Sequence, residues 1–244
     1  MPHVQEIQKQ PPMPLLGPLH LTILSATVVL AFLVAALCRK GALPIKPTRW
    51  TLGSALAANE IVWWIYRYSK EGVHIGNLPL QLCDVAVWFA VLACFIDAQV
   101  ILELAWFPGL AGATMALLTP NLISPWTTYP TVYFFLAHGG IVVCVTAVVL
   151  GGNRKFPSSA IWRSLGLLLI YAALVGTFDL ISGADYMFLL RKPDAVSALD
   201  AMGPWPWYLL SGALVALALF WLLWLPVRLR PCSEALVTSS RSNP

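Results

Sequence analysis

The chain has 244 residues, of which 59% are hydrophobic and 11% are charged, and its formal net charge is +4. Its mean hydropathy is +0.75, which excludes an ordinary soluble domain and is typical of a chain whose surface faces lipid. Basic loops on the inner side of a membrane account for the positive charge, so we expect no nucleic-acid partner. The five cysteines are scattered without a CxxC pair, which indicates neither a disulfide framework nor a metal site.

Apolar segments of about 20 residues, the length that crosses a bilayer, recur along the chain. They predict an all-α, polytopic membrane bundle of about seven transmembrane helices, over residues 19–38, 50–66, 78–96, 100–118, 131–150, 161–181 and 205–226. The fourth span is the least regular, because Glu103 and Pro108-Gly109 interrupt it. Residues 19–228 then form one domain between two tails, 1–18 and 229–244, that we expect to be disordered.

Lysine and arginine are divided unevenly between the two sets of loops. One set, with the C-terminus, collects ten: Arg39, Lys40, Lys46, Arg49, Arg154, Lys155, Arg163, Arg228, Arg230 and Arg241. The other keeps five: Lys9, Arg67, Lys70, Arg191 and Lys192. Because cytoplasmic loops carry the excess of basic residues, we expect the N-terminus outside and the C-terminus in the cytoplasm, in a cell membrane such as the bacterial inner membrane.

Polar side chains stand inside these spans, where hydrocarbon penalises groups without partners. At ~1.5 Å per helical residue, five of them fall within about two turns of one level in the outer leaflet: Glu60, Cys83, Asp84, His138 and Asp179. Glu103 falls near the cytoplasmic side and does not belong to this group. The shared depth makes the five a candidate site.

A thiol and an imidazole at one level suggest nucleophilic catalysis. Cysteine attacks as the thiolate, and a neighbouring histidine takes its proton, so we predict a catalytic pair of Cys83 and His138 within about one water of hydrogen-bond reach. A carboxylate behind His138 would orient its ring. Gln81 and Asn121 can donate hydrogen bonds to an oxyanion.

A site at leaflet depth suits an acyl ester of a membrane lipid better than a soluble substrate, so we predict a lipid acyltransferase or a thioesterase-like enzyme. No nucleotide, flavin, haem or metal motif is visible in the sequence, and we expect no cofactor. The sequence does not indicate an oligomeric state.

Each of these residues also has a purely structural interpretation. A cysteine in a membrane helix often packs as a small apolar residue, and histidine and carboxylates often join helices by hydrogen bonds. Two other functions therefore stay open. The first is a proton-coupled or small-solute transporter, because intramembrane Asp, Glu and His are parts of proton relays. The second is a non-catalytic scaffold that the same residues hold together.

Several motifs point to a family. They are Leu78–Cys83 (LPLQLC), Leu118–Leu122 (LTPNL), Phe134–Gly139 (FFLAHG), Gly183–Pro193 (GADYMFLLRKP) and Gly203–Tyr208 (GPWPWY). Over about residues 74–210 the chain resembles the YwaF-like bacterial integral membrane proteins, which are similar to the eukaryotic transmembrane protein one-six-four, a cysteine-dependent phospholipid acyltransferase. The resemblance implies Cys83 as nucleophile, His138 as base and membrane lipids as substrates.

The fourth motif adds Asp185 and Tyr186 as candidates for binding substrate. Two positions depart from the pattern of the relatives, which carry His where this chain has Gln81 and Asn where it has Asp185. The first departure leaves His138 as the one nearby base. The second adds a carboxylate that would alter which head group is accepted.

Overall fold

The structure is a computed structural model that describes residues 14–120, 122, 125–193 and 198–228. Residues 14–17 form a turn that leads into the first helix. The rest of the predicted tails, and Asn121, lie outside the described residues.

Seven helical rods form the described part of the chain, which confirms the all-α prediction. They are α2 (Pro18–Arg39), α3 (Ile45–Glu71), α4 (Leu82–Phe95), the rod of α5 (Gln99–Leu104), η2 (Ala105–Gly109) and α6 (Leu110–Leu118), the rod of α7 (Tyr129–Thr146) and η3 (Ala147–Gly151), α8 (Ser159–Ser182) and α9 (Trp207–Arg228). Five are long and apolar enough to cross a membrane, and α3 and the shorter α4 are the exceptions. Short 3-10 turns lie at Ile75–Asn77 (η1), Tyr186–Phe188 (η4) and Ala198–Met202 (η5).

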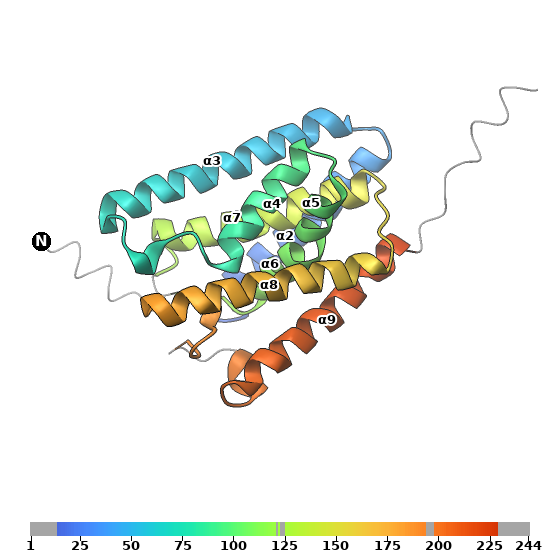
Figure 1. Ribbon diagram of the computed structural model, residues 1–244. Coiled ribbons are helices and arrows are strands. Elements are labelled where there is room, and N and C mark those ends of the chain that lie inside the picture. Colours follow the sequence, from blue (N-terminus) through green and yellow to red (C-terminus); the bar gives the residue numbers. More distant parts are fainter. Residues whose placement is uncertain (1–13, 121, 123–124, 194–197, 229–244) are drawn as a thin grey trace, which may run out of the picture.

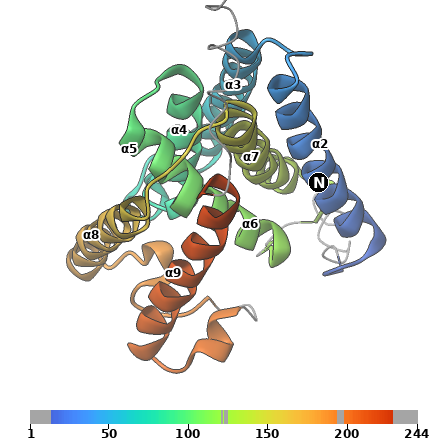
Figure 2. The same cartoon turned by 90° about the vertical axis from the view of Figure 1, so that its right-hand side faces the viewer.

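The rods form two groups. Figure 2 shows α8 and α9 on one side of the molecule and α2, α3, α4 and α7 on the other, with α5 and α6 between them. In Figure 1, α3 and α8 run along opposite sides of the bundle. The core therefore lies where α4, the α5–α6 rod and α7 meet.

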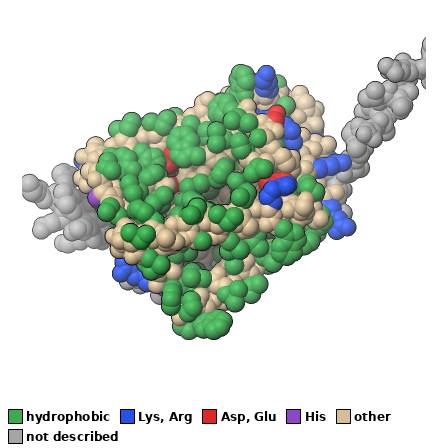
Figure 3. All heavy atoms as spheres, viewed as in Figure 1, with side chains coloured by type: hydrophobic (Ala, Val, Ile, Leu, Met, Phe, Trp, Pro, Cys, Tyr) green, Lys and Arg blue, Asp and Glu red, His purple; other side chains and the backbone are tan. Residues whose placement is uncertain are grey.

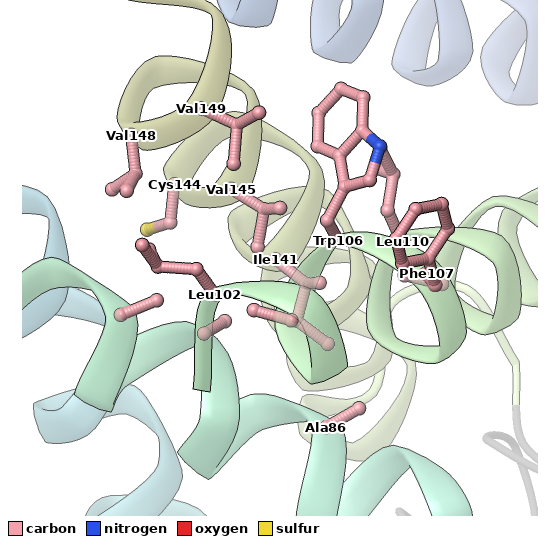
Figure 4. Close-up of a cluster of buried hydrophobic side chains, with 14 of the residues drawn as sticks. Ala86, Leu102, Trp106, Phe107, Leu110, Ile141, Cys144, Val145, Val148 and Val149 are labelled. Atoms are coloured by element: carbon pink, nitrogen blue, oxygen red, sulfur yellow. The ribbon is translucent and has the colours of Figure 1, made fainter. Parts of the chain in front are cut away.

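Apolar side chains, from alanine to tryptophan, fill that core (Figure 4). Ala86, Phe107, Ile141 and Val145 are at most 4% exposed. Lipid gives apolar helices no hydrophobic reason to associate, so close packing has to hold them together. Gly53 provides such closeness between α3 and α4, since a Cβ there would lie 2.6 Å from the Cβ of Cys94.

The fourth rod is continuous, which corrects the expectation that Pro108-Gly109 interrupts it. A π turn at Ala105–Gly109 contains the proline. Proline has no N–H to donate to the carbonyl four residues earlier, and the i→i+5 pattern of a π turn removes that need. Glu103, one turn before, is fully buried and accepts two hydrogen bonds from Arg163 of α8, both 2.7 Å long.

Helix α4 begins at Leu82, four residues later than residue 78 where we expected it. Gln81 is its N-cap in extended backbone conformation, and the preceding residues follow an irregular path past η1. The later start places Cys83 in the first turn of the helix.

Basic side chains gather toward the two ends of the bundle. Figure 3 shows apolar side chains over most of one face, with Lys and Arg mainly at the end where α3 begins. That end holds Arg39, Lys46, Arg49, Arg154 and Arg163, which lie at the ends or starts of α2, α3, α7–η3 and α8. Which end faces the cytoplasm stays a prediction.

Candidate functional site

Cys83 is the second residue of α4 and is partly exposed. The first N–H groups of a helix have no partner within it and present the positive end of its dipole. Asp84 fixes this end of the helix, because its carboxylate accepts a hydrogen bond of 3.1 Å from the backbone N–H of Gln81. The thiol therefore stands beside N–H groups that suit a negatively charged oxygen.

A buried carboxylate cluster lies next to the thiol. Glu60 of α3 is fully buried, and it accepts hydrogen bonds from the hydroxyl of Tyr133 (2.7 Å) and the indole N–H of Trp64 (2.6 Å). Glu60 and Asp84 both lie close enough to act electrostatically on Cys83. Helices α3 and α4 thus bring three of the predicted site residues together, and α7 adds Tyr133.

The segment that leads to Cys83 is bound by the turn after α8. The Tyr186 hydroxyl donates to the carbonyl of Ile75 and accepts from the N–H of Leu78 at 2.7 Å. The Gln81 side-chain oxygen accepts from the N–H of Met187 at 2.8 Å. We call these contacts the loop network, because they join residues 75–81 to residues 186–187.

The turn after α8 holds an unusual backbone conformation. Met187 and Phe188 have φ of 56° and 55°, the left-handed region that costs a residue other than glycine about 1–2 kcal/mol. Such strain persists only where the surroundings impose it. Here Gln81 binds the N–H of Met187, and the Tyr208 hydroxyl donates to the carbonyl of Phe188 at 2.6 Å.

Two aspartates support the same turn. Asp179 is fully buried, and one of its oxygens accepts from the N–H of Tyr186 at 2.9 Å. Its other oxygen has no hydrogen-bond partner within the described ranges. Asp185 accepts from the N–H of Leu190 and from the side chain of Arg191, both at 3.1 Å, so it holds its own turn.

His138 lies on α7 and is 6% exposed. Its Nδ1 is 2.7 Å from the carbonyl oxygen of Phe134. A carbonyl only accepts, so Nδ1 carries the proton and Nε2 is the acceptor in the neutral ring. Among the residues that the structure describes, no hydrogen bond joins the Cys83 thiol to the His138 ring, and the catalytic pair stays a prediction. Buried His20 is engaged elsewhere, with the Leu117 carbonyl at 2.7 Å.

An apolar cavity of about 200 Å³ begins beside the site. It lies between α4, the π turn and α8, and its lining includes Leu82, the neighbour of Cys83, and Tyr171. The Tyr171 hydroxyl donates to the carbonyl of Leu80 at 2.9 Å. A lipid chain would thus meet the first turn of α4.

Three aromatic residues of the site were not predicted: Trp64, Tyr133 and Tyr171. The argument from depth could have found Tyr133, because a carboxylate buried in lipid needs hydrogen-bond donors at its own level. Glu60 lies near the end of one predicted span and Tyr133 near the start of another. The two residues therefore fall toward the same side of the membrane. Tyr171 has no such signal, since its partner is a backbone carbonyl.

The chain matches the TMEM164 family over residues 15–224. It belongs to the TMEM164 family. No curated protein and no solved structure matches the chain. The match confirms the similarity to transmembrane protein one-six-four, whereas the grouping with YwaF-like bacterial proteins stays a prediction. With its five candidate spans, this TMEM164 family member is a multi-pass membrane protein, and every candidate site residue lies within the matched range.

Proposed function

We propose that the protein is a membrane-embedded lipid acyltransferase with Cys83 as its nucleophile. The observation that carries this proposal is the place of Cys83 in the first turn of α4, beside N–H groups that suit an oxyanion and one residue after Leu82, which lines an apolar cavity. The substrates are membrane lipids, and the membrane is the bacterial inner membrane.

The reaction has two halves. The thiolate of Cys83 attacks the ester carbonyl of a phospholipid, the C–O bond breaks, and a lysophospholipid leaves with a proton while a thioester forms. A second lipid hydroxyl then attacks the thioester, which returns the thiol and yields the new ester. Water in place of that hydroxyl gives hydrolysis.

Each half-reaction needs a base and an oxyanion site. His138 is the predicted base, through the Nε2 that its bond to Phe134 leaves unprotonated. The N–H groups at the start of α4 suit the oxyanion. The side-chain nitrogen of Gln81 can join them, since in the described structure only its oxygen is engaged.

The main alternative is a non-catalytic scaffold. The carboxylate of Glu60 is bound through both oxygens, and Tyr186 joins two loops, so these residues also serve as contacts between helices. A proton-coupled transporter has less support, because these polar groups gather toward one end of the bundle.

Acyl transfer between labelled lipids in liposomes tests the proposal, with Cys83→Ser, His138→Ala and the matched variant Cys38→Ser. We expect Cys83→Ser and His138→Ala each to lose at least the ~10²–10⁴-fold typical of general base catalysis, and Cys38→Ser to keep its activity. The double variant should be scarcely slower than either single one, because the two groups act as a unit. A hydroxylamine-labile acyl adduct should map to Cys83. Full activity of purified Cys83→Ser would end the proposal and favour the scaffold.

A further inference from the structure

The apolar cavity between α4, the π turn and α8, which we call the α4–α8 cavity, extends along α4 away from the start of that helix. Its lining on α4 runs from Leu82 through Ala86 to Phe89, and seven residues of helix cover about 10 Å. The facing helix runs beside it in the opposite direction: a Cβ at Gly112 would lie 3.7 Å from Leu82, and one at Gly109 would lie 3.9 Å from Ala86. The cavity therefore runs along one face of α4, and its lining begins at Leu82, the residue before Cys83.

Missing side chains and the π turn create this space. Gly109 of the fourth rod lines the cavity and has no side chain to fill it, and a Cβ there would lie 3.9 Å from Ala86. Pro108, inside the π turn, forms part of the wall. On the far side, α8 contributes Leu168 and Tyr171.

The chemistry of the lining selects an apolar occupant. Tyr171 is its one hydroxyl-bearing residue, and that hydroxyl already donates to Leu80. A buried water needs two to four polar partners, and apolar cavities of about 150 Å³ stay dry and take up a molecule the size of benzene. A cavity of about 200 Å³ thus suits a segment of one hydrocarbon chain, because sites for larger ligands occupy ~300–1,000 Å³.

The cavity opens toward lipid. Its lining residue Leu167 is 37% exposed, and the neighbouring Leu169 and Ile170 of α8 are 47% and 58% exposed. A chain that enters from the bilayer between α4 and α8 reaches Leu82, in the first turn of α4, along an apolar wall.

We propose that the α4–α8 cavity holds the part of a phospholipid acyl chain next to the ester, and that Ala86, Phe89 and Leu168 select which chains fit. The inference rests on the proposed function, since the acyl chain in the cavity is the one whose ester carbonyl the thiol would attack. Cross-linking to a lipid measures the cavity alone, so the test is run without turnover.

The probe is phosphatidylcholine with a diazirine close to the ester carbonyl of one chain, in vesicles that carry the full Cys83→Ser protein. Adducts are mapped by mass spectrometry. We expect them on Ala86, Phe89 and Leu168. Leu168→Trp fills the cavity and should lower the adducts on Ala86 and Phe89 about tenfold, the effect of removing roughly two buried methylene groups.

Leu169→Trp is the matched control, because Leu169 is the next residue of α8 and faces lipid; its adducts should stay within twofold of the parent. Leu168→Ala enlarges the cavity and should raise labelling by a probe with a methyl-branched chain. That comparison decides the matter if Leu168→Trp does not fold.

Adducts confined to lipid-facing residues such as Leu169, or unchanged by Leu168→Trp and Leu168→Ala, would overturn the cavity assignment. Failure of the proposed function looks different. In that case Cys83→Ser retains acyl transfer, whatever the position of the adducts.

Discussion

Tyr186 is 3% exposed, and its hydroxyl satisfies two backbone groups of another loop. A buried backbone N–H or C=O that loses its partner costs about 1–3 kcal/mol. At the residue scale, this phenol is therefore a positioning residue for the segment that leads into Cys83.

We predict that Tyr186→Phe lowers the free energy of unfolding by about 1–3 kcal/mol and reduces kcat of acyl transfer more than it changes KM. Denaturation in detergent and steady-state kinetics measure the two effects. Tyr66→Phe is the control, because Tyr66 accepts a hydrogen bond from the Ser69 side chain through its backbone carbonyl, and the substitution leaves that bond in place. Equal losses in both variants would contradict the positioning role.

Asp97, in the connection between α4 and α5, joins three parts of the chain. One of its oxygens accepts from Arg49 at 2.8 Å and from Arg154 at 2.6 Å. Arg49 also donates to the carbonyl of Ala93, in the last turn of α4. The hydrogen bond from Arg49, with the charges of both arginines, holds the pKa of Asp97 below its ordinary value of 3.8.

This lowered pKa sets a pH dependence. The ionised form is favoured in the folded state, so its contribution to stability is present above pH 3.8 and is lost as the pH falls through the folded-state pKa. We expect Asp97→Asn to lower Tm at pH 7, and the difference from the parent to shrink toward pH 3. Thermal unfolding over that range measures it. A difference that is constant with pH would exclude ionisation as its cause.

At the scale of the helix, two features of the sequence were interpreted only in part. Pro79 and the apolar residues around it suggested a helix from residue 78, whereas the side chains of Gln81 and Asp84 and the distant Tyr186 place the start at Leu82. Pro108-Gly109 suggested a break, whereas packing on several sides supports a π turn. Both outcomes depend on contacts from other helices, which local sequence does not contain.

The pair of Glu103 and Arg163 joins α5 to α8, and only the carboxylate is fully buried. Removal of Arg163 alone leaves the buried charge of Glu103 without a counter-charge. This lowers stability more than the replacement of both partners by apolar residues. We expect Arg163→Leu to lower Tm more than the double variant Glu103→Leu/Arg163→Leu. Thermal unfolding of the three variants in one detergent provides the comparison, and additive losses would contradict it.

At the scale of the whole molecule, hydropathy predicted each rod to within a few residues except the two ends of α3 and the start of α4. The site was predicted less well, because depth along a helix gives only one of three coordinates. Glu60, Cys83 and Asp84 share a depth and also meet. His138 was predicted at the same depth, but rotation about the axis of α7 determines its neighbours, and its bond is to Phe134.

Membrane orientation follows from the ends at which the basic residues lie. We predict that Lys70, near the end of α3, is external and that Arg154, after η3, is cytoplasmic. Impermeant thiol reagents on intact cells that carry Lys70→Cys or Arg154→Cys test this, in a background whose natural cysteines do not label. Labelling at residue 154 and not at residue 70 would show the opposite orientation, with the loop network on the cytoplasmic side.

The loop network also determines where the protein tolerates added sequence. Insertion tolerance depends on the burial and bonding of the backbone it displaces, and a connection between membrane helices is a usual choice for an epitope tag. Between residues 183 and 190 such a tag would separate Tyr186 and Met187 from their partners and disturb the entry to α4. The turn at Lys40–Ala42 bonds through its backbone N–H groups only to the last turn of α2, and Gly41 has open space around it. It is the better place for a fusion, because no distant segment of the described structure depends on these bonds.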